Sequence, residues 1–127
     1  MLPVEYKYSL THEWVFYDKE AKVTKIGITE YIHKQTGDII FLEHKEKNEY
    51  ITKNDEIAIA ESVEHIKRIN TPVSGLIVAV NPIVIRNPSQ INYDCYDKGW
   101  IFEIKGTLDQ AEWEGLMDAD EYLAYIS

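Results

Sequence analysis

Short apolar runs separated by polar, turn-forming residues make up most of the chain up to residue 106. Residues 22–29 alternate between apolar and polar side chains, which is the pattern of a strand with one buried face. Gly27 interrupts this strand, and a glycine there is typical of a bulge or of a close approach by a neighbouring group. Residues 75–81 are nearly all apolar, so we expect that strand to be buried on both faces. Further strands are predicted at residues 38–44, 56–63 and 100–105, and a short Tyr-Ile-Thr stretch lies in the polar connector at residues 45–55.

One short helix is predicted within this β-rich region, at residues 29–37. Thr29 has a side chain that can cap the amino end of a helix, and Gly37 is of a residue type that commonly ends one. Ile32 is expected to face inward. The helix therefore connects two predicted strands.

The end of the chain changes in character after residue 106. Thr107 and Gln110 have the spacing of a capping box, and Asp118 can cap a second short helix. Short strands separated by short turns are typical of a sandwich or a flattened barrel rather than of a parallel α/β sheet. We therefore predict a mainly β fold in one domain spanning residues 1–127, with a short internal helix and two short C-terminal helices.

Composition limits the classes of protein that need to be considered. Apolar residues make up 45% of the chain and charged residues 28%, the ordinary balance of a folded soluble domain. A formal net charge of -9 argues against a nucleic-acid partner, because phosphate neutralisation requires a basic surface. The N-terminal residues lack the pattern of a secretory signal, and no apolar run approaches the roughly 18 residues of a membrane helix. We expect a cytoplasmic protein, in preference to a processed organellar one, that makes no membrane contact.

The chain shows no recognisable catalytic or metal-binding motif. It has no glycine-rich phosphate loop and no serine or cysteine nucleophile with an evident base. Cys95 is the single cysteine, which excludes an internal disulfide, and we interpret it as structural. The four histidines do not have the spacing of metal ligands, so we interpret them as surface or capping residues. They are His12, His33, His44 and His65. These absences favour a carrier or binding module over an enzyme, with no catalytic residue and no metal.

A β-hairpin that presents its tip to a partner is predicted at residues 58–75. An apolar run precedes the tip, and the turn-like sequence TPVSG follows it. We expect the apex at residues 63–65, with Glu64 exposed.

Six segments, in order along the chain, resemble the H protein of the glycine cleavage system, a carrier with a lipoyl-type domain. The most specific features are THEW, IGIT with GDI, PVSG with VN, and GW. The segments are YSLTHEWV (8–15), IGITEYIHKQTGDIIFLE (26–43), ESV (61–63), TPVSGLIVAVN (71–81), INYDCYDKGWIFEIK (91–105) and LMDADEYLAYI (116–126). The resemblance covers nearly the whole chain. It implies a lipoyl-domain-like hybrid barrel-sandwich fold and a place in glycine catabolism.

The same resemblance exposes a departure at the hairpin tip. The family carries lipoate in amide linkage on a lysine in the motif ESVK, and Glu64 stands at that position in this chain. A carboxylate cannot supply the nucleophilic amine that amide formation requires, so we expect this attachment to be lost. Arg68 replaces the family acid that helps to hold the cationic cargo, and its neighbour is Lys67. Thr11 and Glu13 still match the hydroxyl and the acid of the family's arm-binding groove.

Two functions remain open. In the first, which we favour, the chain is a non-lipoylated, monomeric homologue. It has no cofactor, and it binds the enzymes that an H protein visits. The resemblance implies as partners the aminomethyltransferase, the pyridoxal-phosphate decarboxylase, the flavin dehydrogenase or a lipoate-handling enzyme. In the second, the chain is a working aminomethyl carrier that bears lipoate on Lys67, three residues beyond the tip.

Overall fold

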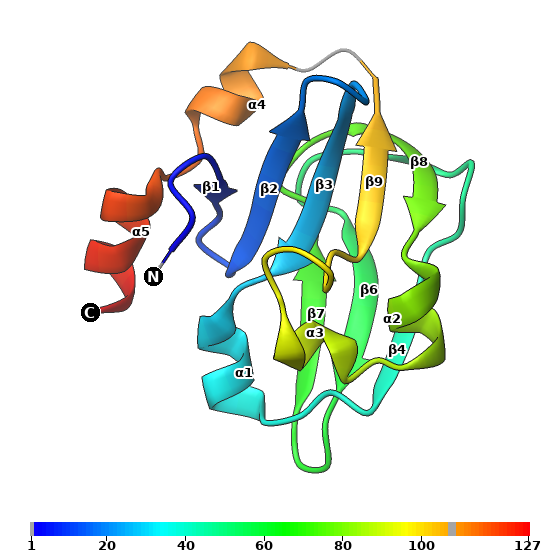
Figure 1. Cartoon of the computed structure of the whole chain (residues 1–127). Coiled ribbons are helices and arrows are strands. Elements are labelled where there is room, and N and C mark those ends of the chain that lie inside the picture. The colour runs from blue at the N-terminus through cyan, green and yellow to red at the C-terminus, as the bar shows by residue number, and fades with distance from the viewer. Residues whose placement is uncertain (1, 107–108) are drawn as a thin grey trace.

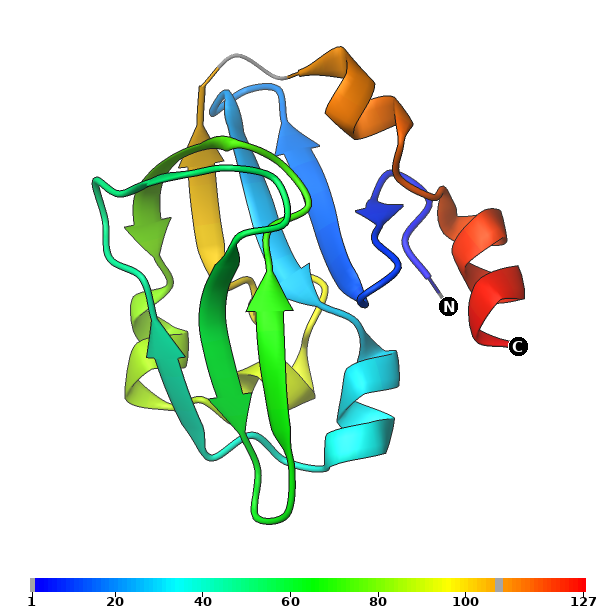
Figure 2. The ribbon, with the colours of Figure 1, turned by 180° about the vertical axis from the view of Figure 1, so that it is seen from behind.

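Two antiparallel sheets form the body of the molecule (Figure 1). The computed structural model describes residues 2–106 and 109–127. The small sheet lies behind the large one in Figure 1 and in front of it in Figure 2. In spatial order, the large sheet contains β1 (Lys7–Tyr8), β2 (Glu13–Asp18), β3 (Val23–Ile28), β9 (Phe102–Lys105), β8 (Gly75–Val80) and β5 (Tyr50–Ile51). The small sheet contains β4 (Phe41–His44), β6 (Glu56–Glu61) and β7 (Ile66–Asn70).

Within the part of the chain that the structure describes, five short helices lie at the ends and the side of this body (Figure 1). They are α1 (Glu30–Thr36), α2 (Pro82–Arg86), α3 (Gln90–Tyr93), α4 (Gln110–Glu114) and α5 (Ala119–Ile126). Helix α1 contacts β7, and α5 contacts β1. None of these helices, within the residues described, is long and apolar enough to cross a membrane.

The core lies between the two sheets and is rich in isoleucine. Both sheets contribute fully buried side chains, among them Ile26 from β3, Ile77 from β8 and Ile69 from β7. Burying one such side chain stabilises the fold by about 1.5–3 kcal/mol relative to leaving it exposed. A second, aromatic cluster around Trp14 and Tyr122 joins the outer side of β2 to α5. The fold thus depends on two separate packed regions.

The predicted strands at residues 22–29, 38–44, 56–63 and 100–105 are confirmed as β3, β4, β6 and β9, with shorter bounds. Gly27 is confirmed as a site of close approach, because a Cβ atom there would lie 2.5 Å from the indole of Trp14, its cross-strand partner. The prediction that residues 75–81 are buried on both faces is wrong. Leu76 on β8 is 36% exposed, because alternation along the strand turns it away from the core that its neighbour Ile77 faces. Strand β7 is the second arm of the hairpin predicted at residues 58–75, whereas strands β1 and β2 and helices α2 and α3 were not predicted as elements.

The internal helix is confirmed as α1, with Thr29 as N-cap, Ile32 buried and Gly37 at the C-cap. Gly37 has a φ of 77°, in the left-handed region that glycine adopts without steric cost. The Thr29 side chain makes no hydrogen bond to the helix. Its Oγ1 instead lies 2.7 Å from the hydroxyl of Tyr122, so the residue joins α1 to α5.

The two C-terminal helices are confirmed as α4 and α5. The predicted capping box of Thr107 and Gln110 lies outside the described residues, since it includes residue 107. Asp109 caps α4 by accepting hydrogen bonds from the backbone N–H groups of the first turn. Asp118 caps α5 as predicted and forms a capping box with Glu121.

Candidate functional site

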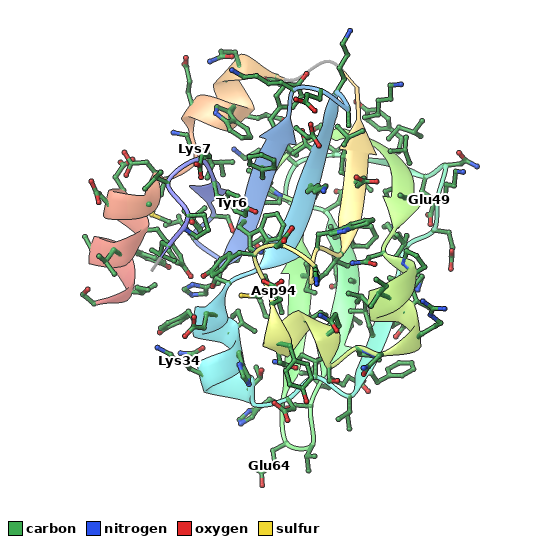
Figure 3. The ribbon with its side chains drawn as sticks, viewed as in Figure 1. Tyr6, Lys7, Lys34, Glu49, Glu64 and Asp94 are labelled. Carbon is green, nitrogen blue, oxygen red and sulfur yellow. The ribbon has the colours of Figure 1, made fainter. Side chains whose placement is uncertain are left out.

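The hairpin between β6 and β7 ends in a two-residue turn. Glu61 pairs with Ile66 as the last register pair, and the Ser62 N–H donates to the His65 carbonyl oxygen at 2.9 Å. Residues 63 and 64 therefore form the turn, and Glu64 points into solvent at the far end of the molecule (Figure 3). The predicted apex and the predicted exposure of Glu64 are both confirmed.

Exposed apolar side chains surround this tip. Phe41, Glu61 and Ile66 are directly opposite one another on three neighbouring strands, so their side chains share one face of the small sheet. The most exposed apolar residues in this region are Val63 (85%), Ile66 (64%), Ile40 (59%) and Phe41 (53%). Apolar groups exposed together are typical of a surface that contacts another protein.

A groove runs from the tip toward the large sheet, between the hairpin and α1; we call it the hairpin groove. Its outer part is a hollow of about 520 Å³ whose lining includes Glu64 and His65. Its inner part is a hollow of about 450 Å³ whose lining includes Ile32, His65 and Lys67. The two hollows share Gln35, Thr36 and His65, so they form one path along β7.

Lys67 and Arg68 point to opposite faces of the small sheet. Lys67 pairs with the buried Ala60 and faces inward, whereas Arg68 pairs with Ile59 and faces outward. The Arg68 guanidinium is held 3.0 Å from the carboxylate of Glu56. The expected grouping of Arg68 with Thr11 and Glu13 is therefore not found, because alternation along a strand turns neighbouring side chains apart.

Lys67 instead reaches the Thr11 and Glu13 pair on the large sheet. Its Nζ donates to the carbonyl oxygen of Thr11 at 2.7 Å and lies 3.4 Å from Oε2 of Glu13. Only 16% of the Lys67 side chain is exposed, and Glu13 is completely buried. Of the predicted site residues, the structure brings Thr11, Glu13 and Lys67 together and leaves Glu64 at the other end of the groove.

The Glu13 carboxylate has partners on both oxygens. Oε1 accepts hydrogen bonds from the hydroxyls of Ser9, at 2.7 Å, and Thr11. Oε2 accepts from the backbone N–H of Asn70 at 3.2 Å. Ser9 and Asn70 were not among the predicted site residues. The β-turn before β2 brings Ser9 to Glu13, four residues along the chain. Asn70 at the end of β7 reaches Glu13 only because the two sheets pack together.

An aromatic group with His12 at its centre adjoins this carboxylate. His12 has a φ of 74°, and its Nδ1 lies 2.8 Å from the hydroxyl of Tyr122. Burial, with a smaller contribution from the charge of Lys67, lowers the pKa of His12 below its ordinary value. Burial also raises the pKa of Tyr122 to about 12. His12 is half-buried rather than a free surface residue, because Tyr122 and Tyr125 of α5 pack beside its ring.

The other histidines and the cysteine have simpler surroundings. His33 Nε2 lies 3.1 Å from Asp38, His44 Nδ1 lies 2.9 Å from the carbonyl oxygen of Lys45, and His65 is exposed beside the tip. Burial raises the pKa of the Cys95 thiol to about 12, so it is protonated at neutral pH. No group of three or more potential metal ligands occurs within residues 2–106 and 109–127.

Two facing antiparallel sheets, with a protruding hairpin that ends in a two-residue turn, define this chain as a mainly β, lipoyl-domain-like protein. A family model described as "Glycine cleavage H-protein" matches residues 6–127. The chain therefore belongs to the glycine cleavage H-protein family.

Individual relatives agree with this assignment. Glycine cleavage system H proteins of Shewanella sp. (strain ANA-3) and Shewanella oneidensis are each 37% identical over 125 residues, covering 98% of this chain and 95% of each relative. The crystal structure of a glycine cleavage system H protein from Mycobacterium marinum superposes with a TM-score of 0.84 at 26% identity, covering 97% of both chains. The predicted lipoyl-domain-like fold is thereby confirmed.

Proposed function

We propose that this chain is an H-protein homologue that carries no lipoyl group at its hairpin tip and acts as a non-catalytic protein-binding module in glycine cleavage or lipoate metabolism. The observation that carries the proposal is Glu64 at the apex of the hairpin, where the resemblance places the lipoyl lysine. An activated acyl group forms an amide only with an amine, and the side chain of Glu64 is a carboxylate. The usual attachment chemistry is therefore absent at this position.

Lys67 is a poor substitute as the attachment site. Its amine faces inward, donates to the carbonyl oxygen of Thr11 and lies beside the buried Glu13 carboxylate. An acylating enzyme would have to withdraw the amine from this ion pair and leave Glu13 buried without its cation, which is costly. The arrangement favours the non-lipoylated function over a carrier lipoylated at Lys67.

The surroundings of the tip support a binding role. Val63 and Ile66 are exposed beside Glu64, and Ile40 and Phe41 extend the apolar surface across β4. Aromatic and aliphatic side chains of this kind form the buried centre of many protein interfaces. We propose that the partner is one of the enzymes that an H protein visits: the aminomethyltransferase, the pyridoxal-phosphate decarboxylase, the flavin dehydrogenase or a lipoate-handling enzyme.

Intact-mass measurement of the protein purified from its own host tests the proposal. We expect the measured mass to equal that of the unmodified chain. Peptide mapping of the same sample should then find no lipoyl group on any residue. A lipoyl mass assigned to Lys67 would overturn the proposal and establish the carrier function.

A rescue variant separates the loss of the amine from a wider change in the hairpin. Glu64→Lys places an amine at the exposed apex while leaving the flanking ESV and PVSG sequences unchanged. A lipoylating enzyme supplied with activated lipoate should then modify residue 64, whereas the unchanged chain should stay unmodified. If the enzyme refuses Glu64→Lys, the hairpin no longer presents a recognisable tip, and the proposed docking role loses its support.

A further inference from the structure

A pocket of about 440 Å³ lies between the first residues of the chain, α1 and α5; we call it the α1–α5 pocket. Glu30, Tyr31 and Lys34 line it from α1. Ile32 and Thr36 of the same helix line the hairpin groove instead, so the two hollows lie on different faces of α1. The first residues of the chain run beside α5 (Figure 1). A volume of this size falls within the range of about 300–1,000 Å³ that is typical of small-molecule sites.

The wall of the α1–α5 pocket belongs to the second packed region of the molecule. Leu2, Tyr96, Tyr122 and Ile126 line the pocket and also pack in the aromatic cluster around Trp14. Tyr122 is fully buried, so its ring is held in place by the core on its other side. A wall that is already ordered loses little conformational freedom when a ligand arrives. The pocket is therefore a preformed, mainly apolar surface.

Tyr96 places a hydroxyl group at this surface. Its oxygen accepts a hydrogen bond from the backbone N–H of Glu30 at 3.1 Å, which fixes it at the first turn of α1. A hydroxyl that accepts one hydrogen bond still has its own hydrogen to donate. Burial raises the pKa of Tyr96 well above its ordinary value, so that hydrogen is retained at neutral pH. The pocket can therefore offer one neutral donor to an oxygen atom of a ligand.

The charged groups of the α1–α5 pocket lie in water. Lys34 and Glu30 pair at 3.6 Å, and their side chains are 73% and 57% exposed. Asp120, in the first turn of α5, is also exposed. A charged ligand would give up its water for an apolar wall, whereas these groups stay hydrated outside it. The two carboxylates also leave the mouth with a net negative charge, which disfavours anions further.

We propose that the α1–α5 pocket binds an uncharged small molecule with an aromatic or aliphatic body and a carbonyl oxygen that accepts the hydrogen of Tyr96. The body packs against Tyr31, Tyr122 and Leu123, which supply aromatic and aliphatic contact area. The inference goes beyond the proposed function and holds whether or not the hairpin tip carries a modification.

The first experiment uses the unchanged protein and three probes of similar size. Acetophenone has a ring and a carbonyl oxygen, ethylbenzene lacks the oxygen, and benzoate carries a negative charge. In two-dimensional amide NMR titrations, acetophenone should shift the signals of Tyr31, Leu123 and Ile126 along a saturable curve, with Kd on the order of millimolar for so small a ligand. Ethylbenzene should bind about fivefold more weakly, because it makes no hydrogen bond to Tyr96. Benzoate should shift none of these signals.

The same titrations can refute the proposal. No response of these signals to acetophenone, or an equal response to benzoate, would overturn it. Shifts of the same signals on dilution of the protein without any probe would show that a second copy covers the pocket, and would overturn it too.

A second experiment locates the probe with variants. Tyr96→Phe keeps the ring and should weaken acetophenone binding about fivefold while leaving ethylbenzene binding unchanged. Ala119→Leu places a larger side chain in the pocket and should abolish the binding of both probes. Ala124→Leu is the matched control, because Ala124 is exposed on the same helix and does not line the pocket.

Equal binding of acetophenone by Ala119→Leu and Ala124→Leu would place the probe elsewhere and overturn the proposal. If Ala119→Leu does not fold, the titrations of the unchanged protein still decide. None of these measurements depends on the lipoylation state of the tip, so this proposal and the proposed function can fail separately.

Discussion

Replacement of Tyr122 by Phe tests how α5 is held to the rest of the molecule. Tyr122 is fully buried, and its ring stacks on Tyr8 at a centroid distance of 4.8 Å. Its hydroxyl lies 2.8 Å from Nδ1 of His12 and 2.7 Å from Oγ1 of Thr29. Phenylalanine keeps the ring and its packing and removes only this oxygen, so the variant isolates the two hydrogen bonds.

The expected magnitude follows from these two contacts. Each hydrogen bond contributes about 0.5–1.5 kcal/mol net, and the buried Thr29 hydroxyl also loses its Tyr122 partner. We therefore expect the free energy of unfolding to fall by about 2–3 kcal/mol. For a chain of this length, that loss lowers Tm by roughly 8–11 °C.

Urea unfolding followed by tryptophan fluorescence measures the loss, with an unchanged m-value as the check on two-state behaviour. Tyr125→Phe is the matched control, because its exposed hydroxyl donates only to the Leu10 carbonyl oxygen, and it should cost less than about 0.5 kcal/mol. In a Thr29→Val background the cost of Tyr122→Phe should shrink, since no hydroxyl is left unpaired there. If Tyr122→Phe costs no more than Tyr125→Phe, α5 is held by ring packing alone and the reasoning is refuted.

Three further predictions concern the strand pairing, pH and the C-terminal helix. Gly27→Ala should destabilise the fold by about 3 kcal/mol in urea unfolding, because the new methyl group would overlap the buried Trp14 indole. The folded chain holds the pKa of His12 below the unfolded value, so the unfolded chain binds that proton more readily. The free energy of unfolding should therefore fall as pH drops through about 6.5, and His12→Gln should flatten this part of the profile. Asp118→Ala should cost about 1 kcal/mol through loss of the capping box, whereas Asp120→Ala in the same first turn should cost less when both are measured by thermal unfolding.

Local features of this protein could be predicted from the sequence because they depend on neighbouring residues. Alternation of apolar residues located β3 and β6, and the spacing between ESV and TPVSG placed the hairpin apex at Glu64. Asp118 was recognisable as the cap of α5, since an N-cap acts within one turn of helix. Short elements such as β1 and α3 escaped prediction, because two to four residues carry too little periodic pattern.

In the candidate site, too, some features could be predicted from the sequence and others depend on the tertiary structure. Its residue types were recognisable from sequence, including Thr11, Glu13 and the tip residue Glu64. Alternation counted back from the buried Ile69 could also have shown that Lys67 faces inward and Arg68 outward. That Lys67 meets Glu13 could not be predicted, because the two residues lie on different sheets and 54 positions apart, at 67 and 13. Only the packing of the small sheet against the large one brings β7 beside β2, and this packing turns a lysine near an exposed tip into the partner of a buried carboxylate.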